Sequence, residues 1–142
     1  MAASANSAHR EGLNNALFVV ASVAAMPVEL DGVAAQVSVL FPWGSLLEGV
    51  SRPEPRALAA LGRVARDRAS LDVVINRSAL RFGVDGLAER YRRVGIAVDR
   101  LDWISASPYR TTWGKRVTFR SDALHIAARL GESSSTESEP AR

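Results

Sequence analysis

Two short clusters around tryptophan hold the residues of this chain that are best suited to do chemistry. The first is residues 40–47 (Leu-Phe-Pro-Trp-Gly-Ser-Leu-Leu), where an apolar run stops at a proline and a tryptophan follows it. If the run is a parallel strand, Trp43 lies beyond its carboxyl end, which is where open α/β sheets bind their ligands. A flat indole there can stack on a nucleobase. The alternative is that Trp43 only plugs the end of the sheet against a helix.

The second cluster is residues 111–116 (Thr-Thr-Trp-Gly-Lys-Arg). Trp113 would provide a second stacking surface, and Lys115 or Arg116 would contact phosphate. The alternative is a turn tryptophan that precedes a strand, with both cations solvated. Each cluster alone therefore allows either nucleic-acid binding or a purely structural role.

Basic residues are concentrated in the middle of the chain. Residues 52–120 contain 15 basic and 7 acidic residues, whereas the whole chain has a net charge of only +3. All the basic residues except Lys115 are arginine. A basic segment of this kind is typical of a protein that binds a phosphate backbone. An arginine-rich composition set by a high-GC genome is the alternative explanation.

Other kinds of site find little support in the sequence. There is no cysteine, which excludes disulfides and thiolate chemistry, and His9 and His125 are too far apart to suggest a local metal site. We predict no metal, and we expect His125 to be a partly buried strand residue rather than a general base. The longest nearly apolar run, residues 16–28, is too short to span a membrane, and no basic region leads into it. We therefore expect a cytoplasmic protein without a membrane partner.

The two clusters need a scaffold, and the hydrophobic pattern predicts alternating strands and helices. The chain has 142 residues, of which 47% are apolar and 23% are charged, and this suits one globular domain. We expect a segment 1–14 that is helical or disordered, a folded part at 15–130 and a disordered tail at 131–142. The resulting fold class is α/β, with a sheet that is parallel at first and antiparallel at its end. The predicted strands are 16–22, 37–41, 71–75, 96–104, 116–120 and 124–128, and the predicted helices are 54–68 and 85–94, the latter capped by Asp85 and ended by Gly95.

The two clusters, together with residues 15–21 (Asn-Ala-Leu-Phe-Val-Val-Ala), resemble a known family. They are similar to the 16S rRNA adenine-N1 methyltransferases that confer aminoglycoside resistance. The likeness runs from about residue 15 to residue 120 and includes the 16-residue spacing from Pro27 to Trp43. It implies a class I methyltransferase that uses S-adenosylmethionine. Its partner would be 16S rRNA in the 30S subunit, where an adenine of the decoding site is flipped out and methylated.

The resemblance also implies roles for individual residues. Trp43 and Trp113 would hold the flipped adenine between them, with Phe41 and Pro42 in the same catalytic motif. Because adenine N1 already carries an in-plane lone pair, catalysis would rest on alignment in a water-poor slot rather than on a strong base. The implied cofactor contacts are Thr111, Leu40 and Ala24, and the implied RNA contacts are Lys115, Arg116, Arg120 and Arg81.

The chain departs from the family at the cofactor site, because it contains no Gly-x-Gly sequence. In the family, whose strand order is 3-2-1-4-5-7-6, residues 16–22 would correspond to the third strand. We therefore expect an incomplete Rossmann-like class I methyltransferase sheet that lacks its first two strands. Three interpretations follow: the C-terminal part of a methyltransferase, completed by a separately encoded N-terminal half; a non-catalytic RNA- or protein-binding remnant; or a decayed gene product without an ordered fold.

Overall fold

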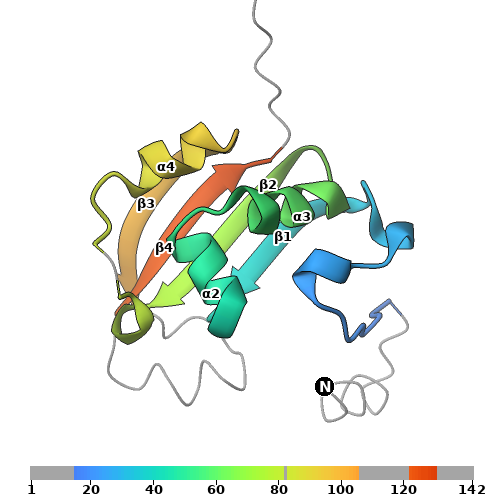
Figure 1. Cartoon of the computed structure of the whole chain (residues 1–142), viewed down its shortest axis with the longest axis horizontal. Helices are drawn as coiled ribbons and strands as arrows, with labels where there is room; N and C mark the ends of the chain where they lie inside the picture. Colours follow the sequence, from blue (N-terminus) through green and yellow to red (C-terminus); the bar gives the residue numbers. More distant parts are fainter. Residues whose placement is uncertain (1–14, 82, 106–121, 131–142) are drawn as a thin grey trace, which may run out of the picture.

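Four strands form one mixed sheet in the computed structural model, which describes residues 15–81, 83–105 and 122–130 (Figure 1). The strands are β1 (Ala34–Leu40), β2 (Ala65–Asn76), β3 (Ala97–Ser105) and β4 (Asp122–Arg129), in the order β1-β2-β4-β3. β1 is parallel to β2, and β4 is antiparallel to both of its neighbours. The predicted α/β class, parallel at first and antiparallel at its end, is therefore confirmed. The predicted strand at 116–120 and the segments 1–14 and 131–142 lie outside the described residues.

The three α-helices within the described residues lie on the same side of this sheet in Figure 1. They are α2 (Gly44–Ser51), α3 (Pro55–Val64) and α4 (Leu87–Arg93). The 3-10 helices η1 (Val23–Ala25) and η2 (Val28–Leu30) precede β1, and η3 (Arg77–Ala79) follows β2. Proline at the first position suits the start of α3, whose apolar stripe of Leu58, Leu61 and Val64 is buried. α4 ends before Gly95, which has φ +83° as the predicted C′ glycine requires. Its N-cap is Gly86 rather than Asp85, so that detail of the prediction is wrong.

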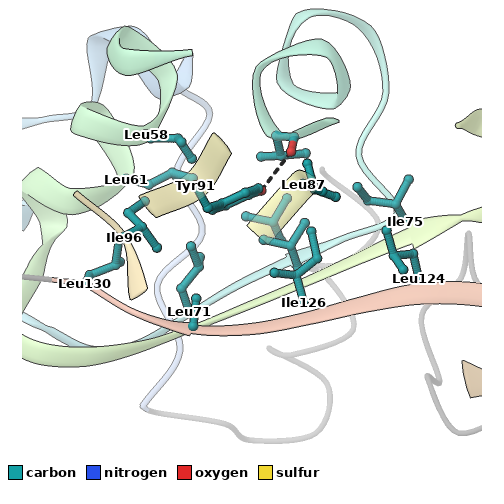
Figure 2. Close-up of a cluster of buried hydrophobic side chains, with 14 residues drawn as sticks. Leu58, Leu61, Leu71, Ile75, Leu87, Tyr91, Ile96, Leu124, Ile126 and Leu130 are labelled. Carbon is teal, nitrogen blue, oxygen red and sulfur yellow. Dashed lines mark hydrogen bonds between the residues drawn. The ribbon is translucent and has the colours of Figure 1, made fainter. Parts of the chain in front are cut away.

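The core lies between the helices and the sheet. The register places Val39, Val73, Ile126 and Leu101 in one row across the four strands, and these side chains belong to the apolar cluster under the helices. Tyr91 of α4 is fully buried there, and its hydroxyl donates a hydrogen bond of 2.8 Å to the carbonyl oxygen of Val50 (Figure 2). That carbonyl lies in the last turn of α2, where carbonyl groups lack partners within the helix. Tyr91 therefore ties α4 to α2.

A polar network occupies the other face of the sheet. His125 of β4 is buried and pairs through Nε2 with Oδ1 of Asp72 on β2, at 2.8 Å. The second oxygen of the same carboxylate accepts a hydrogen bond of 3.1 Å from the side-chain amide of Gln36 on β1. His125 is a strand residue as predicted, and it is buried more completely than the predicted partial burial. Its carboxylate partner also explains how an imidazole is accommodated among apolar neighbours.

Two predicted elements differ from those observed. Residues 16–22 form no strand, and Leu17 and Val20 are exposed. An apolar run becomes a strand only beside a partner, and this segment instead leads to η1, which packs on α3. The helix predicted at 54–68 ends at Val64 because Ala65 pairs with Ala34 and begins β2. Strand pairing thus overrides the helical spacing at that point.

Candidate functional site

A strained turn at the carboxyl end of β1 presents Trp43 to solvent. Phe41 has φ +50° and Gly44 has φ +60°, so a residue with a left-handed backbone conformation stands on each side of Pro42 and Trp43. A left-handed conformation costs a non-glycine residue about 1–2 kcal/mol. The Phe41 ring is buried with Val74 of β2, and its backbone N–H donates to the Val74 carbonyl at 2.8 Å, which holds the turn in place.

The Trp43 indole is 81% exposed. A tryptophan that plugged the end of the sheet would be buried against a helix, so that interpretation is wrong. Pro42, by contrast, is buried and fixes the chain just before it. The turn therefore fixes the backbone at Trp43 and leaves its aromatic ring exposed, as a stacking surface requires.

A pocket of about 1110 Å³ opens beside this turn. It brings together five of the residues that the sequence singled out, from η1 and from the end of β1. The lining also includes residues from the beginnings of α2 and α3, and it is mainly apolar. The five are Ala24, Leu40, Phe41, Pro42 and Trp43.

The pocket fits a flat, apolar-faced group better than it fits a complete S-adenosylmethionine. That cofactor needs backbone amides that approach it closely and polar partners for its ribose, and glycine-rich loops provide the first. The sequence contains no Gly-x-Gly, and the polar side chains of the described lining are only Ser22, Ser45, Glu54 and Arg56. Ala24 and Leu40 therefore provide an apolar wall rather than a full cofactor site.

The remaining predicted residues are elsewhere. Arg81 is exposed in the connection between η3 and α4, apart from the pocket. Thr111, Trp113, Lys115, Arg116 and Arg120 lie outside the described residues.

Sequence reasoning missed a second aromatic group at the same end of the sheet. Arg77, the first residue after β2, places its guanidinium carbon 4.8 Å from the ring centre of Trp103 on β3. Arg77 also pairs with Asp122 at the start of β4, at 3.3 Å. The one available signal was the position of Trp103 in a strand that is otherwise rich in charge, with Asp99, Arg100 and Asp102 just before it.

The described residues contain neither a metal-binding cluster nor a membrane-spanning helix. In the ranges 15–81, 83–105 and 122–130, no group of three or more His, Asp or Glu side chains could bind a metal ion. No helix in those ranges is both long enough and apolar enough to cross a membrane.

Comparison with known proteins gives consistent matches. The model of the family described as "NpmA: 16S rRNA (adenine(1408)-N(1))-methyltransferase" matches residues 1–131. A 16S rRNA (adenine(1408)-N(1))-methyltransferase of Escherichia coli is 30% identical over 128 residues, covering 76% of this chain and 58% of that protein. Its namesake from Streptoalloteichus hindustanus is 30% identical over 139 residues, covering 85% of this chain and 64% of that protein. The chain thus spans about three fifths of the length of these relatives.

Solved structures agree with the sequence relatives. The 16S rRNA methyltransferase KamB superposes with a TM-score of 0.74 at 26% identity, covering 92% of this chain and 71% of that one. The antibiotic-resistance methyltransferase Kmr superposes with a TM-score of 0.61 at 32% identity, covering 82% and 60%. Because the family model also matches nearly the whole sequence, this chain belongs to the 16S rRNA (adenine(1408)-N(1))-methyltransferase family.

Proposed function

We propose that this chain is the adenine-binding, C-terminal part of an S-adenosylmethionine-dependent 16S rRNA adenine-N1 methyltransferase. The observation that carries the proposal is the exposed Trp43, held by the Phe41–Gly44 turn at the mouth of an apolar pocket. A flipped adenine of the rRNA would stack on this indole. Trp113 would provide the second stacking face, and Thr111 would lie near the methyl donor.

The residues of this chain would act by binding and orienting the base. Stacking fixes the plane of the adenine, and the apolar wall of Leu40 and Ala24 keeps water from N1. S-adenosylmethionine supplies the methyl group when it is bound. Since N1 already carries a lone pair, no side chain has to remove a proton before the attack, and alignment carries most of the rate enhancement.

Basic side chains would hold the rRNA around the flipped base. Arg81 is exposed and faces no carboxylate within the described residues, so it is available for a phosphate. Lys115, Arg116 and Arg120 would do the same work near Trp113. Phosphate contacts of this kind set the position of the protein on the RNA and make binding depend on salt.

A further polypeptide would supply the cofactor loop, and the two edges of the sheet suggest where it joins. The β3 edge is protected by a bulge between Val98 and Arg100 and by charged side chains, as natural outer edges are. β1 (Ala-Ala-Gln-Val-Ser-Val-Leu) has no charged residue and, among the described strands, pairs with β2 alone. Exposed Val28 and Val33 precede it. The order β1-β2-β4-β3 corresponds to 4-5-7-6 in the family order, which leaves the place beside β1 for the first strand. We propose that a separately encoded N-terminal half adds its strand there.

The proposal is tested by binding of the chain to purified ribosomal subunits. We expect salt-dependent binding to 30S subunits that is at least tenfold tighter than binding to 50S subunits, measured by filter binding from 50 to 200 mM salt. Equal binding to the two subunits would show only a nonspecific attraction of arginine to RNA and would contradict the proposal. Binding to 30S subunits without methyl transfer in the presence of an N-terminal half would favour the alternative, a non-catalytic RNA-binding remnant.

A further inference from the structure

Three strands end close together at the edge of the sheet that carries Trp43. β1, β2 and β3 all point the same way, because β4 is antiparallel to both β2 and β3. The arrowheads of β1 and β2 lie at the lower edge of the sheet in Figure 1. Trp103, near the carboxyl end of β3, therefore lies at the same edge of the sheet as Trp43. The backbones of β1 and β3 are about 14 Å apart there, if each of the three strand steps is about 4.8 Å.

The side chains of Arg77 and Trp103 form a cation–π pair at this edge. Trp103 is 43% exposed, and the Arg77 guanidinium lies over its ring. Among the described residues, Arg77 makes one side-chain hydrogen bond, to a carboxylate oxygen of Asp122. That bond orients the planar guanidinium of Arg77, which also lies over the Trp103 indole.

The contacts of Arg77 with Asp122 and with Trp103 are too exposed to add much to the stability of the fold. The side chains of Arg77 and Asp122 are 62% and 58% exposed, and ion pairs of this kind contribute little to stability. An exposed cation–π pair is also a weak contact. What the arrangement does provide is a partly exposed indole beside a partly exposed guanidinium. An aromatic ring next to a cation suits stacking of an unpaired base beside an RNA phosphate.

We infer that Arg77 and Trp103 form a second nucleotide-binding platform, which stacks on an unpaired rRNA base near the flipped adenine. The inference rests on the proposed function, since it takes the same rRNA as the partner. Asp122 is a positioning residue in this arrangement, because it acts by orienting the guanidinium. The platform lies across the end of the sheet from Trp43, so the two aromatic groups would hold different nucleotides of one strand.

The test compares 30S binding by the full chain and its variants at several salt concentrations. Arg77→Ala and Trp103→Ala are each expected to weaken binding about tenfold, as loss of a stacked base does. Arg77→Lys is expected to weaken it nearly as much, because lysine keeps the charge but not the plane. The control is Arg92→Ala, which removes an exposed arginine paired with Glu89 on α4 and should change binding less than twofold. Thermal unfolding of each variant confirms that it folds like the wild type.

The outcomes separate this inference from the proposed function. If Arg77→Ala and Trp103→Ala bind 30S subunits as Arg92→Ala does, the platform is wrong while the proposed function stands. If Arg77→Lys binds like the wild type and Arg77→Ala does not, Arg77 is a simple phosphate contact and the stacked platform is overturned. If the wild type shows no preference for 30S subunits, the proposed function fails first.

Discussion

Replacing Trp43 by alanine is expected to reduce methyl transfer to 16S rRNA by about 100-fold or more. The assay uses the chain co-expressed with the part of the Escherichia coli relative that lies outside the matched region, with 30S subunits as substrate. Loss of stacking costs about 1–3 kcal/mol per base, and a misplaced reacting atom can cost a further ~100-fold. The same substitution should weaken 30S binding by the chain alone about tenfold.

Trp43→Ala should lose methyl transfer without losing folding stability. Trp43 is 81% exposed, so its truncation removes few packing contacts, and the free energy of unfolding should change by less than about 0.5 kcal/mol. Trp43→Phe is the matched control, because it keeps an aromatic ring on the same turn, and we expect it to retain most of the binding. Unchanged 30S binding by Trp43→Ala would remove this indole from the adenine site.

The largest effect on stability is expected at Tyr91. Tyr91→Ala should destabilise the fold by about 3–5 kcal/mol, because it removes a fully buried ring from the main apolar cluster. Tyr91→Phe keeps the ring but leaves the Val50 carbonyl without its 2.8 Å hydrogen bond, which should cost about 1–3 kcal/mol. Urea unfolding of the two variants beside the wild type measures both values.

The same residue predicts how stability depends on alkaline pH. Burial raises the pKa of Tyr91 above its ordinary value of 10.0, so the folded state keeps a proton that the unfolded state loses. Stability from this group is therefore complete below pH 10 and falls as the pH rises further. Tyr91→Phe should abolish that part of the alkaline loss. An unchanged alkaline slope in Tyr91→Phe would show that the buried hydroxyl is not its source.

Much of the scaffold follows from hydrophobic pattern. The predicted strands at 37–41, 71–75, 96–104 and 124–128 all overlap observed strands, because apolar runs that end in turn residues are the usual sign of a buried strand. α2 was not predicted, since two glycines within Gly44–Ser51 lower its helix propensity. Tertiary packing favours it: Gly49 sits so close to Ala57 of α3 that a Cβ there would lie 2.6 Å from the alanine Cβ.

The candidate functional residues were only partly predictable. Trp43 stands out because its motif places an aromatic residue directly after a strand and a proline. Arg77 and Trp103 are 26 positions apart and give no local signal; only the order β2-β4-β3 brings them together with Asp122. The strand predicted at 16–22 shows the opposite limit, because the segment is apolar but no strand of the described residues pairs with it.

The most direct test of the central claim is calorimetric titration of the purified 142-residue chain with S-adenosylmethionine up to millimolar concentration. We propose that this chain holds the adenine-binding side of the site and that a further polypeptide supplies the glycine-rich cofactor loop. We therefore expect no saturable binding by the chain alone. Saturable binding in the micromolar range would show that this chain forms a cofactor site by itself, and would contradict the account.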